Sequence, residues 1–104
     1  MVILINSPRL TDYGVYEYRP LTIDGARQMV TEGFQSAIGH TSTAAVLSEL
    51  LGCRVETARE TYLQRPGEHA IVFELLERLP EGHVIDRGEI ERIGYRFGLL
   101  SRVA

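Results

Sequence analysis

The sequence has no lysine, one cysteine and no long apolar run. Cys53 cannot form an internal disulfide and has no CxxC partner for a metal site, so cysteine usage favours a reducing compartment. No apolar run approaches the roughly 20 residues that cross a membrane, and the N-terminal MVILINSPRL lacks the basic-then-apolar pattern of a secretion signal. We therefore expect a cytoplasmic protein that does not associate with a membrane.

Excess positive charge is also lacking. The net charge of −3 argues against a protein that coats nucleic acid through bulk charge, although it allows a local basic pocket. All eleven cationic residues are arginine, and planar guanidinium groups hold phosphate and stack on bases better than ammonium groups do. The 104 residues are of a size typical of one domain, 1–104, with enough chain to bury a core.

Apolar and turn patterns predict an α/β (α+β) domain, in which a mixed β-sheet is packed by short helices. Residues 70–76 form an almost continuous apolar run, which is typical of a central strand covered on both faces. The turn signal Pro66-Gly67 indicates an antiparallel hairpin between the segments on either side. Helices are expected at 22–33, 44–51 and 86–93, with Thr22 capping the first and an Asp86 and Glu89 capping box opening the last. Other strands are expected at 2–6, 15–19, 34–38 and 95–103, with one or two more in 54–64, where Val55, Tyr62 and Leu63 would point inward.

The stretch 37–52, AIGHTSTAAVLSELLG, organises the rest of the chain. A short apolar run ends at a glycine, His40 follows, and a helix rich in alanine and leucine runs to Gly52. Thr41 or Ser42 is the predicted N-cap, and Gly52 suits the left-handed residue that ends a helix. A histidine, hydroxyl groups and free backbone amides would thus meet at the positive end of a helix dipole, which favours an anion or a phosphate. Local pattern alone also allows His40 to be an ordinary loop histidine.

A second candidate group is Arg78 with Glu81, in the loop that follows the predicted central strand. Loops at strand ends present charged side chains from a rigid base, so ligands often bind there. An arginine in such a loop can hold phosphate, and a glutamate can orient an imidazole. The alternative is a solvated RLPEG turn whose charges point to water.

No sequence motif indicates a metal or an organic cofactor. HExxH, CxxC, P-loop and GxGxxG patterns are all missing. Ser42 lies close to His40, but nearby loop positions rarely give the geometry of a serine–histidine pair, and capping accounts better for Ser42. His69 and His83 are interpreted as ordinary residues at a strand start and a turn. His40 is therefore the leading candidate for chemistry, and no cofactor is expected.

Three stretches, LINSPRL, SAIGHTSTAAVLSELLG and ERLPEGHVIDRGEIERI, resemble the viral ring nuclease family of type III anti-CRISPR proteins. The similarity covers nearly the whole chain. It implies a homodimer that binds cyclic tetra-adenylate, the second messenger of type III CRISPR systems, in a pocket across the dimer interface. It further implies cleavage without metal into linear di-adenylates that carry a 2′,3′-cyclic phosphate, which would switch off the signal.

The resemblance also assigns residues. It implies that His40 is the catalytic histidine and Glu81 the assisting glutamate, while Arg78 and Arg59 face phosphate. Asn6 matches an asparagine after the family's first strand. The substrate-binding residues expected from the resemblance and from the local pattern are Asn6, Arg9, Gly39, Thr41, Ser42, Thr43, Arg59 and Arg78.

The chain departs from the family pattern at two places. The family often has asparagine before the phosphate-facing arginine, whereas this chain has Ala58 before Arg59. Viral members carry a serine a few residues after the first strand's asparagine, and simple alignment places Arg9 there.

The expected chemistry suits these residues. The ribose 2′-OH attacks the neighbouring phosphorus in line, so the enzyme must hold that geometry, stabilise the phosphorane and protonate the departing 5′-oxygen. His40 is the natural general acid, and Glu81 would orient it or favour its protonated form. Arg78 and the amides of the 41–43 turn would stabilise phosphate charge. A two-fold dimer would offer two copies of His40 to a ring of matching symmetry.

Three other functions remain open at the level of sequence. The first is a protein that keeps the messenger pocket but only sequesters or senses the ring. The second is a small DNA-binding or transcription-related protein, although the acidic balance and the lack of an arginine-rich recognition helix argue against stable binding to duplex nucleic acid. A purely structural protein would show neither ligand binding nor a concave pocket near His40.

Overall fold

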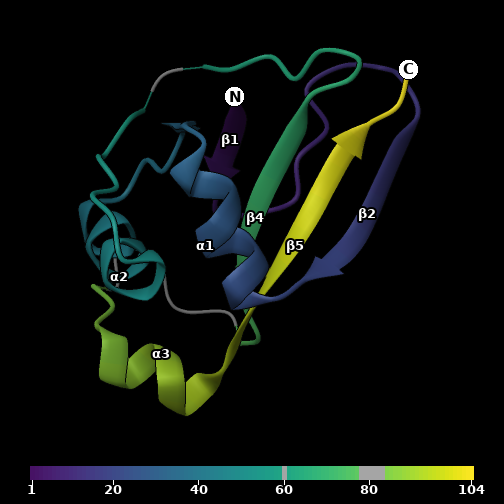
Figure 1. Cartoon of the computed structure of the whole chain (residues 1–104). Coiled ribbons are helices and arrows are strands. Elements are labelled where there is room, and N and C mark those ends of the chain that lie inside the picture. The colour runs from purple at the N-terminus through teal and green to yellow at the C-terminus, as the bar shows by residue number, and fades with distance from the viewer. Residues whose placement is uncertain (60, 78–83) are drawn as a thin grey trace.

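In the part of the chain that the structure describes, five strands form one sheet in the order β2-β5-β4-β1-β3 (Figure 1). The structure is a computed structural model that describes residues 1–59, 61–77 and 84–104. The strands are β1 (Val2–Ile5), β2 (Tyr16–Leu21), β3 (Phe34–Ser36), β4 (His69–Leu75) and β5 (Tyr95–Arg102). The helices in the described residues are α1 (Ile23–Thr31), α2 (Thr41–Leu51) and α3 (Arg87–Ile93).

The sheet is mixed, as the sequence predicts. β1 pairs in parallel with β3 and β4, while β5 runs antiparallel to both β4 and β2. β4 lies in the middle of the sheet, and its residues 70–73 are all buried. The prediction of a central strand at 70–76 is confirmed, because both faces of β4 are covered.

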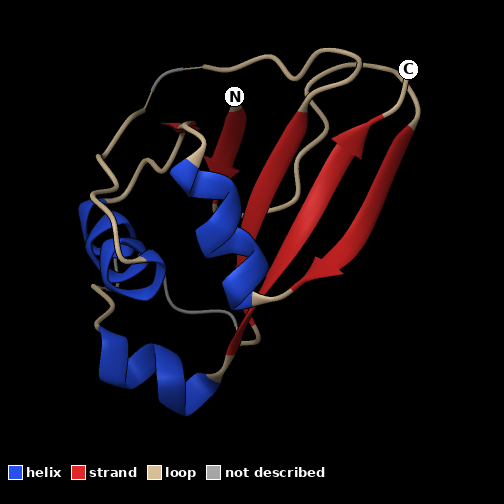
Figure 2. Cartoon of the chain, in the orientation of Figure 1, coloured by secondary structure: helices blue, strands red, loops and turns tan. Residues whose placement is uncertain are grey.

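The helices pack on one face of the sheet (Figure 2). Strand side chains that point to this face, such as Ile71 and Phe73, form one buried cluster with residues of all three helices, including Ala26, Leu47 and Ile90. The α+β architecture expected from the sequence is therefore confirmed as a single layer of helices on a mixed sheet.

The opposite face of the sheet, called the outer face below, carries a smaller apolar cluster. Tyr16, Ala37 and Tyr62 pack against this cluster, and Ala37 and Tyr62 belong to loops. Loop segments thus cover the outer face beside β1 and β4. The buried members of the cluster are Ile3, Ile5, Ala70, Val72 and Leu100.

Two of the predicted helix starts are confirmed. Thr22 Oγ1 accepts a hydrogen bond from Gly25 N–H at 3.0 Å, and Asp86 Oδ1 accepts one from Glu89 N–H at 2.8 Å. Gly52 ends α2 in the left-handed conformation, with φ of 70°, as the sequence predicts.

The prediction of strands within 54–64 is wrong for the described part of that segment, which is irregular. Its backbone groups bond to α2 and to the chain after β3 instead of to a neighbouring strand. Val55 N–H donates to Ser48 Oγ at 2.8 Å, and Ala58 N–H donates to Ile38 O at 2.8 Å. Val55 is buried as expected, but Leu63 is 51% exposed, so its predicted inward direction is wrong.

The Pro66-Gly67 turn forms, yet it does not close the predicted hairpin. Gly67 N–H donates to Arg102 O at 2.8 Å, and Arg102 N–H donates to Glu68 O at 3.0 Å. The turn therefore attaches to the end of β5 before the chain enters β4. Over the part of the chain that the structure describes, no helix has the length and apolar character needed to cross a membrane.

Candidate functional site

A pocket of about 550 Å³ lies where three loop segments meet beside the outer face. The first segment follows β1, the second joins β3 to α2, and the third is the 54–64 segment. This concavity is called the His40 pocket below. Its lining residues are Arg9, Leu10, Thr11, Ala37, Gly39, His40, Ala58, Arg59, Thr61 and Tyr62.

His40 is the N-cap residue of α2. Its backbone is extended, with φ of −119° and ψ of 127°, and its carbonyl accepts a hydrogen bond from Ala44 N–H at 3.0 Å. The residue is exposed, and within the described structure its imidazole makes no capping hydrogen bond. The imidazole is therefore available to a ligand at the end of the helix where backbone N–H groups point outward.

The predicted capping role of Thr41 or Ser42 is wrong. The helix begins at Thr41, one residue before the start that a Thr41 cap requires and two before the start that a Ser42 cap requires, so both hydroxyl residues lie inside the first turn. Thr41 is exposed, Ser42 is half-buried and Thr43 is buried. None of the three side chains is among the described residues that line the His40 pocket. Their expected contribution to phosphate binding stays a prediction.

Arg59 is attached to the backbone next to His40. Its Nε donates a hydrogen bond to Gly39 O at 3.0 Å, while the residue remains exposed. A methyl group on Gly39 would contact Arg59 Cγ at 3.6 Å, which is an ordinary distance. Space within the protein therefore does not require glycine at this position. The bond leaves the terminal nitrogens of the guanidinium beside the pocket, where they can receive an anion.

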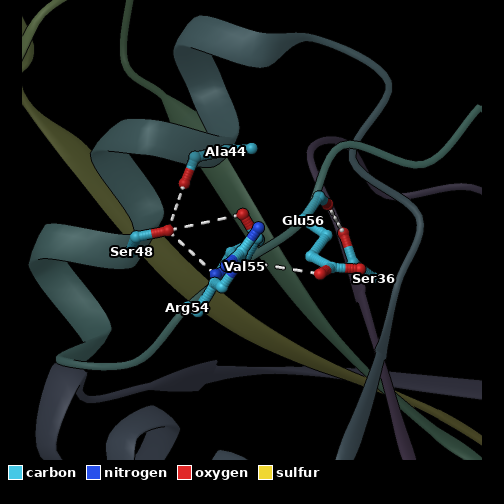
Figure 3. Close-up of polar contacts among 6 residues, drawn as sticks. All are labelled: Ser36, Ala44, Ser48, Arg54, Val55 and Glu56. Atoms are coloured by element: carbon cyan, nitrogen blue, oxygen red, sulfur yellow. Dashed lines mark hydrogen bonds and ion pairs between the residues drawn. The ribbon is translucent and has the colours of Figure 1, made fainter.

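Hydrogen bonds from α2 and β3 hold the 54–64 segment in place (Figure 3). Ser48 Oγ donates to Ala44 O at 2.8 Å and accepts from Val55 N–H at 2.8 Å. Ser36 Oγ donates to Glu56 O at 2.6 Å. The bond from Ala58 N–H to Ile38 O adds to these contacts, which together hold the segment beside the chain that leads into His40. Arg59 is thereby placed on the same pocket as His40.

Tyr62 and Arg9 also line the pocket. The Tyr62 ring packs against the outer-face cluster, and burial raises the pKa of its hydroxyl, with the positive charge of Arg9 acting in the other direction. Thr11 Oγ1 accepts a hydrogen bond from Gln64 N–H at 2.9 Å, which joins the segment after β1 to the 54–64 segment. This bond holds the segment that carries Arg9 against the segment that carries Tyr62.

The structure brings together four of the predicted site residues: Arg9, Gly39, His40 and Arg59 all line one pocket. Asn6 is exposed directly after β1 and is not among the lining residues. Arg78 and Glu81 lie outside the described residues. Sequence reasoning missed Tyr62 as a site residue, because its spacing indicated only an inward-pointing strand position.

A second pocket of about 570 Å³ lies around the ends of β2 and β5 and contains none of the predicted site residues. Tyr18, Arg19, Tyr95 and Arg96 are among its lining residues, and the lining is mostly apolar. Within the described residues, no group of three or more histidine, cysteine, aspartate or glutamate side chains is arranged to hold a metal ion. The His40 pocket is thus the place where a histidine and two arginines converge.

A sequence profile of the family described as STIV B116-like matches residues 2–97. The chain belongs to this family. Among similar proteins, YddF of Bacillus subtilis (strain 168), named as uncharacterized, is 35% identical over 105 residues, covering 98% of this chain and 97% of YddF. Uncharacterized protein 26 of Sulfolobus islandicus filamentous virus (isolate Iceland/Hveragerdi) is 32% identical over 109 residues, covering 99% and 92%.

The solved structure of B116 of Sulfolobus turreted icosahedral virus has the same fold as this STIV B116-like chain. Its TM-score is 0.76 at 22% identity, and the match covers 97% of this chain and 98% of B116. At that identity the likeness shows the fold alone. The names of these three proteins state no activity and no ligand, so the function is argued from the pocket.

Proposed function

We propose that this STIV B116-like protein is a metal-independent ring nuclease that cleaves cyclic tetra-adenylate into linear di-adenylates with a 2′,3′-cyclic phosphate. Such cleavage would switch off type III CRISPR signalling. The observation that carries the proposal is that three separate segments bring Arg9, His40 and Arg59 to one pocket. This supports the resemblance noted in the sequence, because phosphodiester cleavage needs a proton donor beside groups that hold phosphate charge.

The proposed reaction assigns a step to each group. Arg59 is hydrogen-bonded to Gly39 O through its Nε, and its terminal nitrogens bind a phosphate oxygen together with the backbone amides at the start of α2. The ribose 2′-hydroxyl gives its proton to water as its oxygen forms a bond to phosphorus. The bond from phosphorus to the 5′-oxygen breaks, and the His40 imidazolium gives its proton to that leaving oxygen. Glu81 and Arg78, which lie outside the described residues, are proposed to orient His40 and to bind phosphate.

A homodimer is part of the same proposal. A cyclic tetra-adenylate has two-fold symmetry, and two pockets related by a two-fold axis would present two His40 residues to opposite phosphates. Cleavage at both positions gives two di-adenylates, whereas one cleavage gives a linear tetra-adenylate.

Incubation of the purified protein with cyclic tetra-adenylate and EDTA, followed by mass spectrometry, tests the function. We expect linear di-adenylate with a cyclic phosphate, since no metal takes part in the proposed steps. An intact ring that nevertheless binds in calorimetry would favour a sequestering or sensing protein. An intact ring without binding would contradict both.

A further inference from the structure

The Tyr62 hydroxyl is buried and has no hydrogen-bond partner among the described residues. Such atoms are uncommon, because an unpaired buried hydroxyl loses its bonds to water without replacement. Gln64 Oε1 is the other described side-chain atom of this kind. Gln64 is an anchor of the fold, since it is fully buried and its Nε2 donates to Leu100 O and Glu68 O at 2.9 Å. Tyr62 differs because it also lines the His40 pocket.

The surroundings of Tyr62 define what its hydroxyl can bind. Burial raises its pKa, so at neutral pH the phenol keeps its proton and can donate a hydrogen bond. Arg9 acts on this hydroxyl with positive charge and lines the same pocket. Tyr16 is also close, but its own hydroxyl is already bonded to Asp12 O at 3.0 Å. A hydrogen-bond donor beside a guanidinium suits an anionic oxygen better than it suits a sugar hydroxyl or a base nitrogen.

We propose that Tyr62 is a substrate-binding residue whose hydroxyl donates a hydrogen bond to a phosphodiester oxygen, with Arg9 binding the same phosphate. The identity of the substrate rests on the function proposed above. The hydroxyl is covered in the ligand-free protein, so the proposed binding includes a movement of the groups that cover it. The Tyr62 ring stays fixed by its packing against Ile3, Ile5 and their neighbours.

If Tyr62 has this role, removing its hydroxyl should weaken ligand binding but should not lower the stability of the free protein. Tyr62→Phe removes only the hydroxyl and keeps the packed ring. Because the hydroxyl is unpaired in the free protein, its removal should leave the Tm unchanged or raise it by up to about 4 °C. Because the hydroxyl meets a charged oxygen in the complex, its removal should weaken ligand binding about 10- to 100-fold.

The measurement uses the full chain carrying His40→Ala, so that the ligand is not consumed. Calorimetry gives the Kd for cyclic tetra-adenylate and for linear 5′-phosphorylated di-adenylate, and thermal unfolding gives the Tm without ligand. Tyr16→Phe on the same background is the control, since it removes a hydroxyl that is already partnered. We expect this control to lower the Tm and to leave the Kd of both probes within about twofold.

A Tyr62→Phe protein that binds both probes as tightly as its parent would overturn the proposal, and so would a loss of Tm comparable to that of the control. Tyr62-dependent binding in a protein that does not cleave the ring would support the proposal and reject the ring nuclease. A parent that binds neither probe would contradict both proposals.

Discussion

Arg9, His40 and Arg59 are exposed side chains on loops, and the buried clusters of the fold do not include them. Exposed loop positions contribute little to stability, so their replacement should affect ligand binding or catalysis more than folding. The sequence could indicate His40, because a glycine and a histidine directly before a predicted helix form a pattern of residues that are adjacent in the sequence. It could not indicate Tyr62, whose position depends on how an irregular segment crosses the outer face.

The Thr41 or Ser42 cap shows a second limit at this scale. The residue types favour N-caps, but the helix begins one residue earlier than a Thr41 cap requires and two earlier than a Ser42 cap requires. The residue at which α2 begins depends on where β3 ends and where α2 packs on the sheet. Local composition specifies neither of these positions.

Tyr18 gives a prediction for stability at high pH. Its hydroxyl donates to Glu74 Oε1, and burial, followed by this bond and the Glu74 charge, raises its pKa from 10.0 to about 12, against the opposing charge of Arg96. The folded state therefore keeps this proton while the unfolded state loses it. The stabilisation is fully present below pH 10 and is lost as pH rises through about 12.

Denaturant unfolding between pH 8 and pH 12 measures this effect. The free energy of unfolding should fall as pH rises above about 10, and Tyr18→Phe should make the fall shallower. Tyr13→Phe is the matched control, because Tyr13 is 94% exposed. Equal slopes for the Tyr18→Phe protein and its parent would contradict the assignment.

At the scale of elements, the 54–64 segment determines the shape of the His40 pocket. Its apolar residues Val55, Tyr62 and Leu63 predicted strands, yet its backbone bonds to groups outside the segment, such as Ser48 Oγ and Ile38 O. These partners are set by tertiary packing, which overrides strand propensity. β4 was predictable because a strand buried on both faces is apolar at every position.

Ser48→Ala tests how the segment is held. The substitution removes the acceptor of Val55 N–H, in a half-buried place. Leaving that group unpaired should cost about 1–2 kcal/mol of stability. It should also weaken binding of cyclic tetra-adenylate to the His40→Ala protein, because Arg59 lies on the same segment.

Thermal unfolding and calorimetry follow the two effects of Ser48→Ala. Ser101→Ala serves as the control, since its hydroxyl bonds to His69 Nδ1 at 2.8 Å on an exposed part of the sheet away from the pocket lining. A Ser48→Ala protein with unchanged Tm and unchanged Kd would show that the segment is held by other contacts.

At the scale of the whole molecule, the sheet separates two kinds of surface. The helices bury the larger cluster on one face, while loops cover the outer face and form the His40 pocket beside it. The class of fold followed from the sequence because alternating strands and capped helices leave few ways to bury both. The proposed dimer did not follow from these patterns and was expected only from the family resemblance, because assembly depends on the shape of a surface.

The cleavage rate of cyclic tetra-adenylate by His40→Ala, measured in EDTA with protein in excess, tests the central claim most directly. His69→Ala is the control, since His69 is exposed and is not among the residues of the His40 pocket. We predict that His40→Ala lowers the rate by at least about 10²-fold while ring binding persists, and that His69→Ala cleaves like the parent. A His40→Ala protein that cleaves the ring as fast as the parent would contradict the account.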